Sequence, residues 1–158
     1  MATWRWAGLV LSGWLLGACM PPHAQDVSDV ARDLNVAARF GRMDVAVEHT
    51  AEQAREGFVQ RRAEWGRDLR VVDVEMMMLN MKGTDAAEVF VDVSWMRINE
   101  GLLRATRVKQ VWNNPGGGWK LTDESRAAGD VGLFGEPVVV LRPDPMREPA
   151  RFPTKTIR

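Results

Sequence analysis

The fold is decided by one stretch of the sequence, Ala87-Glu88-Val89-Phe90-Val91-Asp92-Val93-Ser94-Trp95. Its odd-numbered positions are all apolar, and three of its four even-numbered positions are polar. Successive side chains of a β-strand point to opposite faces of a sheet, so this period of two predicts a strand with one buried face. The segments on both sides of the stretch share its period.

Four segments with this period follow one another, and short turns separate them. The predicted strands cover 69–81, 87–95, 106–112 and 119–124. Strands joined by short turns run in opposite directions, so we expect a four-stranded antiparallel meander.

The end of the first strand is unusually apolar. Residues 76–81 are apolar at nearly every position, which predicts either a bulge or a strand covered on both faces. In a regular strand Met76 and Met77 point to opposite faces. The methionines of this segment are therefore expected to pack in the core rather than to bind Cu(I) together.

Alternation also assigns faces to charged residues. It places Glu124 on the face opposite to the apolar residues of the last strand. Arg104, Arg107 and Lys109 of the third strand are expected to pair with Glu88 and Asp92 of the second. Such pairs mainly make a sheet face soluble.

Helical periodicity precedes the strands. Apolar residues three or four positions apart predict a first helix over 26–41, with Asp26 as its N-cap and Gly41 at its left-handed end. Helices followed by an antiparallel meander form an α+β domain, in which the helices pack on one face of the curved four-stranded sheet. We expect this domain to occupy residues 26–126.

Two shorter helices are predicted after the first. Asp44 is expected to cap one that runs through 45–47. Thr50 and Gln53 have the spacing of a capping box, which predicts a third helix that ends at Gly66.

The amino-terminal residues have a different composition. Arg5 precedes an almost wholly apolar run at 7–18, and Cys19, the one cysteine of the chain, follows that run directly. A signal-peptide core has this length, whereas a membrane-spanning helix needs about 20 apolar residues. Residues 1–18 are therefore predicted to be a signal peptide.

The stretch Leu15-Leu16-Gly17-Ala18-Cys19 resembles the lipobox of bacterial lipoproteins. The resemblance implies cleavage between Ala18 and Cys19, and acylation of Cys19 so that membrane lipid becomes its partner. Two or three acyl chains anchor a protein stably. The alternative is that Cys19 is a small apolar residue in an uncleaved anchor.

The lipobox also implies a location. A lipoprotein of this kind is held on a membrane of the bacterial cell envelope, with its domain in the periplasm. Met20, in place of an aspartate after the cysteine, favours the outer membrane. Residues 19–25 are then a short tether between the lipid and the domain.

The carboxyl-terminal segment, 127–158, contains five of the eight prolines. Its composition predicts an extended tail, in which 138–141 could add one edge strand. Its last residues are basic and either contact anionic lipid headgroups or form a solvated tail, and we favour the solvated tail.

Composition excludes several classes of function. Lys+Arg and Asp+Glu are both 21, so the chain has no excess of positive charge to bind nucleic acid. A single cysteine excludes an intramolecular disulfide framework and a zinc site with several thiolates. No residues have metal-ligand spacing and no glycine-rich phosphate loop is present, so we expect neither metal nor cofactor.

The order of helices and strands, together with Gly118-Trp119-Lys120-Leu121-Thr122-Asp123-Glu124, resembles the nuclear-transport-factor-two-like superfamily, whose α+β fold is cystatin-like. The resemblance covers about 27–126. It implies a sheet wrapped around the helices into a cone with a pocket. Some members are polyketide-cyclase-like isomerases or dehydratases, and many others only bind ligands or partners, so the fold alone does not choose a function.

Four residues are candidates for a site. Three of them are tryptophans on the apolar faces of adjacent strands: Trp95, Trp112 and Trp119. Their side chains either line the bottom of a ligand pocket or fill the core. His49 is the one histidine of the predicted domain; it is either a general base oriented by an acid such as Asp73, or a surface or capping residue.

These observations favour a lipid-anchored envelope protein whose domain binds a small apolar ligand or an envelope protein without catalysis. The alternative is a lipid-anchored enzyme of the polyketide-cyclase or isomerase type, with His49 as general base. A structural role in envelope maintenance is a third hypothesis, which the sequence does not separate from the first.

Overall fold

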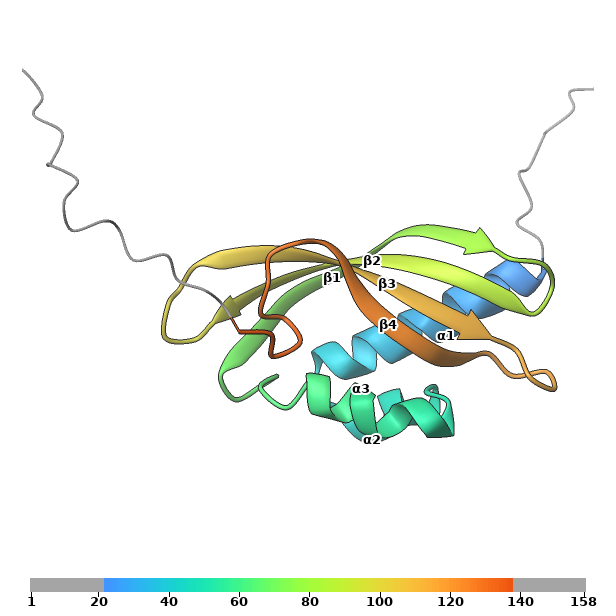
Figure 1. The fold of residues 1–158 in the computed structure, drawn as a ribbon, viewed down its shortest axis with the longest axis horizontal. Coiled ribbons are helices and arrows are strands. Elements are labelled where there is room, and N and C mark those ends of the chain that lie inside the picture. The colour runs from blue at the N-terminus through green and yellow to red at the C-terminus, as the bar shows by residue number, and fades with distance from the viewer. Residues whose placement is uncertain (1–21, 138–158) are drawn as a thin grey trace, which may run out of the picture.

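The computed structural model describes residues 22–137 (Figure 1). The predicted signal peptide, Cys19 and the segment 138–141 lie outside the described residues. Eight elements follow one another in the order α1 (Pro22–Arg39), α2 (Met43–Glu48), η1 (Glu52–Ala54), α3 (Arg55–Arg61), β1 (Leu69–Met81), β2 (Ala86–Arg97), β3 (Leu103–Asn113) and β4 (Lys120–Gly129).

The four strands form one sheet in the order β1-β2-β3-β4, and every neighbouring pair is antiparallel. Figure 1 shows α1 lying along the curled sheet, with α2 and α3 beside α1. The predicted α+β fold with a four-stranded antiparallel meander is therefore confirmed. None of the helices in the described part of the chain is long and apolar enough to cross a membrane.

The core lies between α1 and the inner face of the sheet. Every second residue of β2 is buried there, from Ala87 to Trp95, as the period of two predicts. Helix α1 contributes residues spaced three or four apart, including Val27, Ala31 and Leu34, which are fully buried. Burying each such Leu or Val side chain contributes about 1.5–3 kcal/mol.

Strand β1 contains two bulges, between Val71 and Asp73 and between Met76 and Met78. The second confirms the bulge that the apolar segment predicted. It turns Met78 to the outer face, opposite Phe90 of β2, and returns Leu79 to the inner face opposite Val89. The prediction that all these methionines pack in the core was therefore wrong, because Met77 and Met78 are 48% and 53% exposed.

Helix α1 begins four residues earlier than predicted. Residues 22–25, assigned to an extended tether, are helical, and Asp26 lies inside the helix rather than at its N-cap. Proline is tolerated in the first turn because the N–H that it lacks would have no partner there. At the other end, Gly41 has a φ of +73° and confirms the predicted left-handed end.

The predicted capping box at Thr50 is absent. The Thr50 hydroxyl donates to the carbonyl of Ala46 at 3.1 Å, and no side chain caps η1 or α3. The backbone on both sides of Thr50 pairs with Leu121 of β4, which turns the hydroxyl back toward α2. Helix α3 ends at Arg61 rather than at Gly66. Asp44 does not cap α2 either, because it lies inside the first turn of that helix, after Arg42 at the N-cap.

The domain extends beyond the boundary expected at residue 126. Strand β4 continues to Gly129, and Leu133 is fully buried. The indole nitrogen of Trp65 donates to the carbonyl of Leu133 at 3.0 Å. Residues 127–137, expected in the proline-rich tail, are thus part of the packed domain.

The outer face of the sheet carries the expected ion pairs. Arg107 donates two hydrogen bonds of 2.7 Å to Asp92, and these hold the pKa of Asp92 below its ordinary value. Lys109 lies 2.6 Å from Glu88 and lowers the pKa of that carboxyl in the same way. Both cross-strand pairs agree with the prediction, whereas Arg104 pairs with Glu100 at 2.6 Å instead of with an acid of β2.

Candidate functional site

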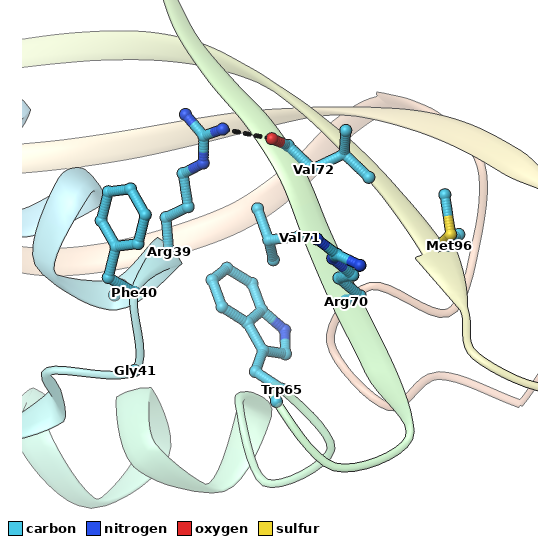
Figure 2. A pocket seen from close by; sticks show the side chains of 10 residues that line it. Arg39, Phe40, Gly41, Trp65, Arg70, Val71, Val72 and Met96 are labelled. Carbon is cyan, nitrogen blue, oxygen red and sulfur yellow. Dashed lines mark hydrogen bonds between the residues drawn. The ribbon is translucent and has the colours of Figure 1, made fainter.

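A hollow of about 580 Å³ lies between the carboxyl end of α1 and the first residues of β1 (Figure 2). Pockets that bind small molecules have volumes of roughly 300–1,000 Å³, so this hollow is large enough for one. It is lined by Ala38, Arg39, Phe40, Gly41, Trp65, Gly66, Arg70, Val71, Val72 and Met96.

Two glycine turns form the rims of the hollow. After α1, the N–H of Gly41 donates to Ala38 and the N–H of Arg42 donates to Ala37, which is the hydrogen-bond pattern of a Schellman helix end. Gly66 has a φ of +78°, and its N–H donates to Leu69 at the start of β1. The turn at Gly41 ends α1 at Arg39 and leaves the next residue, Phe40, 68% exposed.

Arg39 spans the hollow from α1 to β1. Its guanidinium donates to the carboxylate of Asp73 at 2.9 Å and to the carbonyl of Val72, and the second of these bonds is drawn in Figure 2. The guanidinium also lies 5.3 Å from the centre of the Phe40 ring. Arg39 is therefore fixed in position, and Asp73 balances its charge.

Arg70 is the second cation of the hollow. It projects from β1 on the exposed side of the strand, and its side chain has no hydrogen bond or ion pair with any described residue. The remaining lining is apolar, apart from backbone. The hollow therefore combines apolar walls with one guanidinium that has no counter-charge among the described residues.

The lining offers no group for acid–base or nucleophilic chemistry. None of its ten described residues is an aspartate, glutamate, histidine, cysteine, serine or lysine. Within residues 26–137, no three His, Cys, Asp or Glu side chains cluster closely enough to hold a metal ion. The hollow can bind and orient a ligand, and its side chains are not those that transfer protons.

The three candidate tryptophans lie in the core and not in this hollow. Trp95 and Trp112 are fully buried and Trp119 nearly so. The indole of Trp95 donates to the hydroxyl of Thr106 at 2.9 Å. These positions match the core-filling alternative that the sequence left open.

His49 also lies away from the hollow. It is half-buried at the end of α2, where its carbonyl accepts a hydrogen bond from the N–H of Leu121 at 2.9 Å. Asp73, the acid considered as its partner, pairs instead with Arg39. The structure therefore does not bring together the histidine and the acid of the proposed general base.

The space inside the curled sheet, where the superfamily resemblance placed a pocket, holds mainly core side chains. A smaller hollow of about 220 Å³ remains there between α1 and the sheet, lined by Arg32, Asn35, Val36, Val74, Met76 and Val91. Among the core side chains is a polar pair, because Asn35 of α1 and Gln110 of β3 exchange amide hydrogen bonds of 3.1 and 3.0 Å. Gln110 is fully buried. This pair fixes α1 against the middle of the sheet.

A second buried cluster surrounds Glu124. Both oxygens of its fully buried carboxylate accept hydrogen bonds from Arg62, one of them at 2.7 Å, and Arg61 donates to the carboxylate at 3.1 Å. The Arg62 guanidinium lies 3.6 Å from the centre of the Phe58 ring and 5.5 Å from that of Phe134. The cluster joins α3, β4 and residues 130–137, so its position indicates a structural role.

The sequence did not single out Arg39, Phe40 or Arg70 as site residues. Phe40 gave no signal, because single apolar residues are common on protein surfaces. Nothing in the sequence placed the end of α1 beside Trp65 and the first residues of β1.

Solved structures with this fold support its assignment. A ketosteroid isomerase-like protein from Erwinia carotovora atroseptica aligns over 69% of this chain and 99% of its own, with a TM-score of 0.58 and 8% identity. An NTF2-like protein from Cytophaga hutchinsonii aligns over 69% and 99%, with a TM-score of 0.53 and 15% identity. A SEC-C motif containing protein from Rhodopseudomonas palustris aligns over 66% and 81%, with a TM-score of 0.56 and 17% identity.

The comparisons with sequences found nothing: no protein-family model and no curated protein matches this chain. The structural likenesses are all below 20% identity, so they concern the fold alone. The fold is NTF2-like, as the resemblance implied.

Proposed function

We propose that this chain is a lipid-anchored protein of the bacterial cell envelope whose α+β domain binds a small ligand without catalysis. The observation that carries the binding function is the hollow of about 580 Å³ lined by Arg39 and Arg70. It has the volume, the apolar walls and the few fixed polar groups that are typical of a binding site. The proposed anchor rests on the resemblance of residues 15–19 to a lipobox.

The alternative, an isomerase with His49 as general base, gains less support. One structural neighbour is named a ketosteroid isomerase-like protein, but the likeness concerns the fold. His49 is not among the residues that line the hollow, and a general base has to lie within hydrogen-bond reach of its proton.

The position of the proposed anchor suits a ligand taken from the aqueous space. Helix α1 begins at Pro22, three residues after Cys19, so an acylated Cys19 would hold the amino end of α1 close to the bilayer. The hollow lies at the other end of this helix of 18 residues, which is about 27 Å long. In this arrangement the domain faces the periplasm. We place the anchor in the outer membrane because Met20, and not an aspartate, follows Cys19.

The test uses residues 19–158 with Cys19→Ser, which lack the signal peptide and the acyl chains. Decanoate is titrated and its binding followed by calorimetry, and the recovered compound is examined by mass spectrometry. Val71→Trp fills the hollow, and we expect it to abolish binding. Val59→Trp adds the same ring to an exposed position on α3 and should leave binding unchanged.

Both variants are first checked for parental circular dichroism and melting temperature. Failure of the parent to bind either decanoate or its uncharged analogue decanol, or equal binding by the two variants, would refute the binding function of the hollow. Recovery of a chemically altered compound would favour the enzyme.

A further inference from the structure

We infer that the ligand of this hollow is an amphipathic monoanion, with its charged head at Arg70 and its apolar part against Phe40, Trp65 and Met96. The inference rests on the proposed function and names its ligand class. Three observations carry it: the charge balance around Arg70, the exposure of Phe40, and the division of the lining into a charged and an apolar part.

Around the hollow, Arg70 is the cation whose charge is not balanced by an acid of the described residues. Three acids close to Arg70 along the chain each have another partner: Asp73 pairs with Arg39 at 2.9 Å, Asp68 with Arg67 at 2.8 Å, and Glu64 with Arg97 at 3.0 Å. Arg70 has no such partner among the described residues. An anion bound in the hollow therefore meets one uncompensated positive charge.

The guanidinium chemistry favours an oxyanion. Arginine presents its N–H groups as a planar fork that matches carboxylate geometry and forms charge-assisted hydrogen bonds. Arg39 cannot supply a second unbalanced charge, because Asp73 already neutralises it. A dianion would leave one negative charge without a counter-charge beside apolar walls, which is costly. The match is therefore to a single negative charge.

The apolar part of the lining is equally defined. Figure 2 shows Phe40 at the end of α1 and Trp65 in the loop after α3 on one side of β1, and Met96 of β2 on the other side, in register with Arg70. All three line the hollow. Phe40 is an aromatic side chain that is 68% exposed at the rim. An apolar group entering the hollow would cover it and remove its surface from water.

The test compares four ten-carbon compounds at pH 7.5, all below their micelle concentrations: decanoate, decyl phosphate, decanol and decyltrimethylammonium. We expect decanoate to bind about tenfold more tightly than decanol, which corresponds to one charge-assisted interaction. The cation should bind most weakly. Decyl phosphate is mostly dianionic at this pH, since its second pKa is about 6, and should bind less tightly than decanoate.

Arg70→Gln should lower the affinity for decanoate about tenfold and leave that for decanol unchanged. Lys82→Gln removes the same charge at the far end of β1, where Lys82 lies 3.4 Å from Glu88. This control should bind both compounds as the parent does. Calorimetry gives both affinities directly.

The outcomes separate this inference from the function on which it rests. If decanol binds as tightly as decanoate, or Arg70→Gln has no effect, the ligand is not an anion held by Arg70, while the hollow remains a binding site. A preference for decyl phosphate overturns the monoanion and points to a phosphate ester. If none of the four compounds binds, the proposed function fails together with the inference.

Discussion

Glu124 is the residue at which burial and charge conflict most directly. Its carboxylate is fully buried, and its charge is met by Arg62, which is almost as deeply buried, and by Arg61. A buried ion pair contributes little net stability, because both charges lose their water. The removal of one partner is costly, because the other charge is then left buried and unpaired.

We therefore predict that Glu124→Gln lowers the free energy of unfolding by about 3 kcal/mol, measured by urea denaturation. Asp68→Asn is the matched control, since it removes the acid of an exposed pair with Arg67 and should not change stability measurably. Replacing both buried partners, with Arg62→Met and Glu124→Leu, should restore much of the loss. A loss below about 1 kcal/mol in Glu124→Gln would contradict the role given to this pair.

The burial of Glu124 could not be predicted from the alternation of apolar and polar residues in the sequence. Regular alternation places Leu121 and Glu124 on opposite faces, yet both are buried. A bulge in β4 leaves Thr122 without a partner in the pairing with β3, and this brings Leu121 and Glu124 to the same side. A period of two locates a strand, whereas a bulge depends on the pairing with its neighbour.

At the scale of elements, the end of β4 depends on one glycine. Gly129 has a φ of +84°, and a Cβ atom at this position would lie 2.3 Å from the carbonyl oxygen of Ala105. This close approach lets Asp130 bind the backbone of Ala105 through two hydrogen bonds of 2.8 and 2.9 Å. The hydroxyl of Thr106 also donates to the carbonyl of Asp130 at 2.7 Å.

Gly129→Ala should destabilise the domain by more than Gly135→Ala. Both positions have a positive φ, which costs an alanine about 1 kcal/mol or more. Only Gly129 adds a collision with backbone, because a Cβ at Gly135 would meet nothing within 4 Å. The comparison is made by thermal and urea unfolding, and equal losses in the two variants would disprove the packing argument.

The strands were easier to predict from the sequence than the helix ends. Apolar and polar residues alternate over several positions in each strand, so the strand can still be recognised when a bulge interrupts the alternation. The capping box at Thr50 failed because a distant residue, Leu121, pairs with the backbone around it. A local motif cannot report a partner that comes from the other end of the domain.

At the scale of the whole molecule, the hollow could not be predicted from the sequence, because its lining comes from segments that are distant in the chain. The hollow is assembled from the end of α1, the loop after α3, the first residues of β1 and the end of β2. These segments lie side by side only after the sheet has curled against α1. The tryptophans were conspicuous in the sequence, but large apolar residues on strand faces mostly fill a core.

The anchor is tested on the whole molecule by its intact mass after extraction from the membrane fraction. We expect the mass of residues 19–158 plus acyl groups. Cys19→Ala should instead retain the mass of residues 1–158, because the processing implied by the lipobox requires the cysteine. A parent protein with the mass of 1–158, or an unmodified 19–158 in the soluble fraction, would rule out lipidation.

The order of the sheet has a consequence for how the chain folds. Because β1-β2-β3-β4 is also the order of synthesis, each hairpin can close over a short loop, an event that takes about 1–10 μs. Other essential contacts are distant in the chain, since Arg62 and Glu124 are 62 positions apart. Contacts of such separation form late, because the loop between them costs entropy to close. The helices, which are synthesised first, can therefore complete their packing only after β4 has been synthesised. The domain is complete when β4 pairs with β3 and its Glu124 binds Arg62.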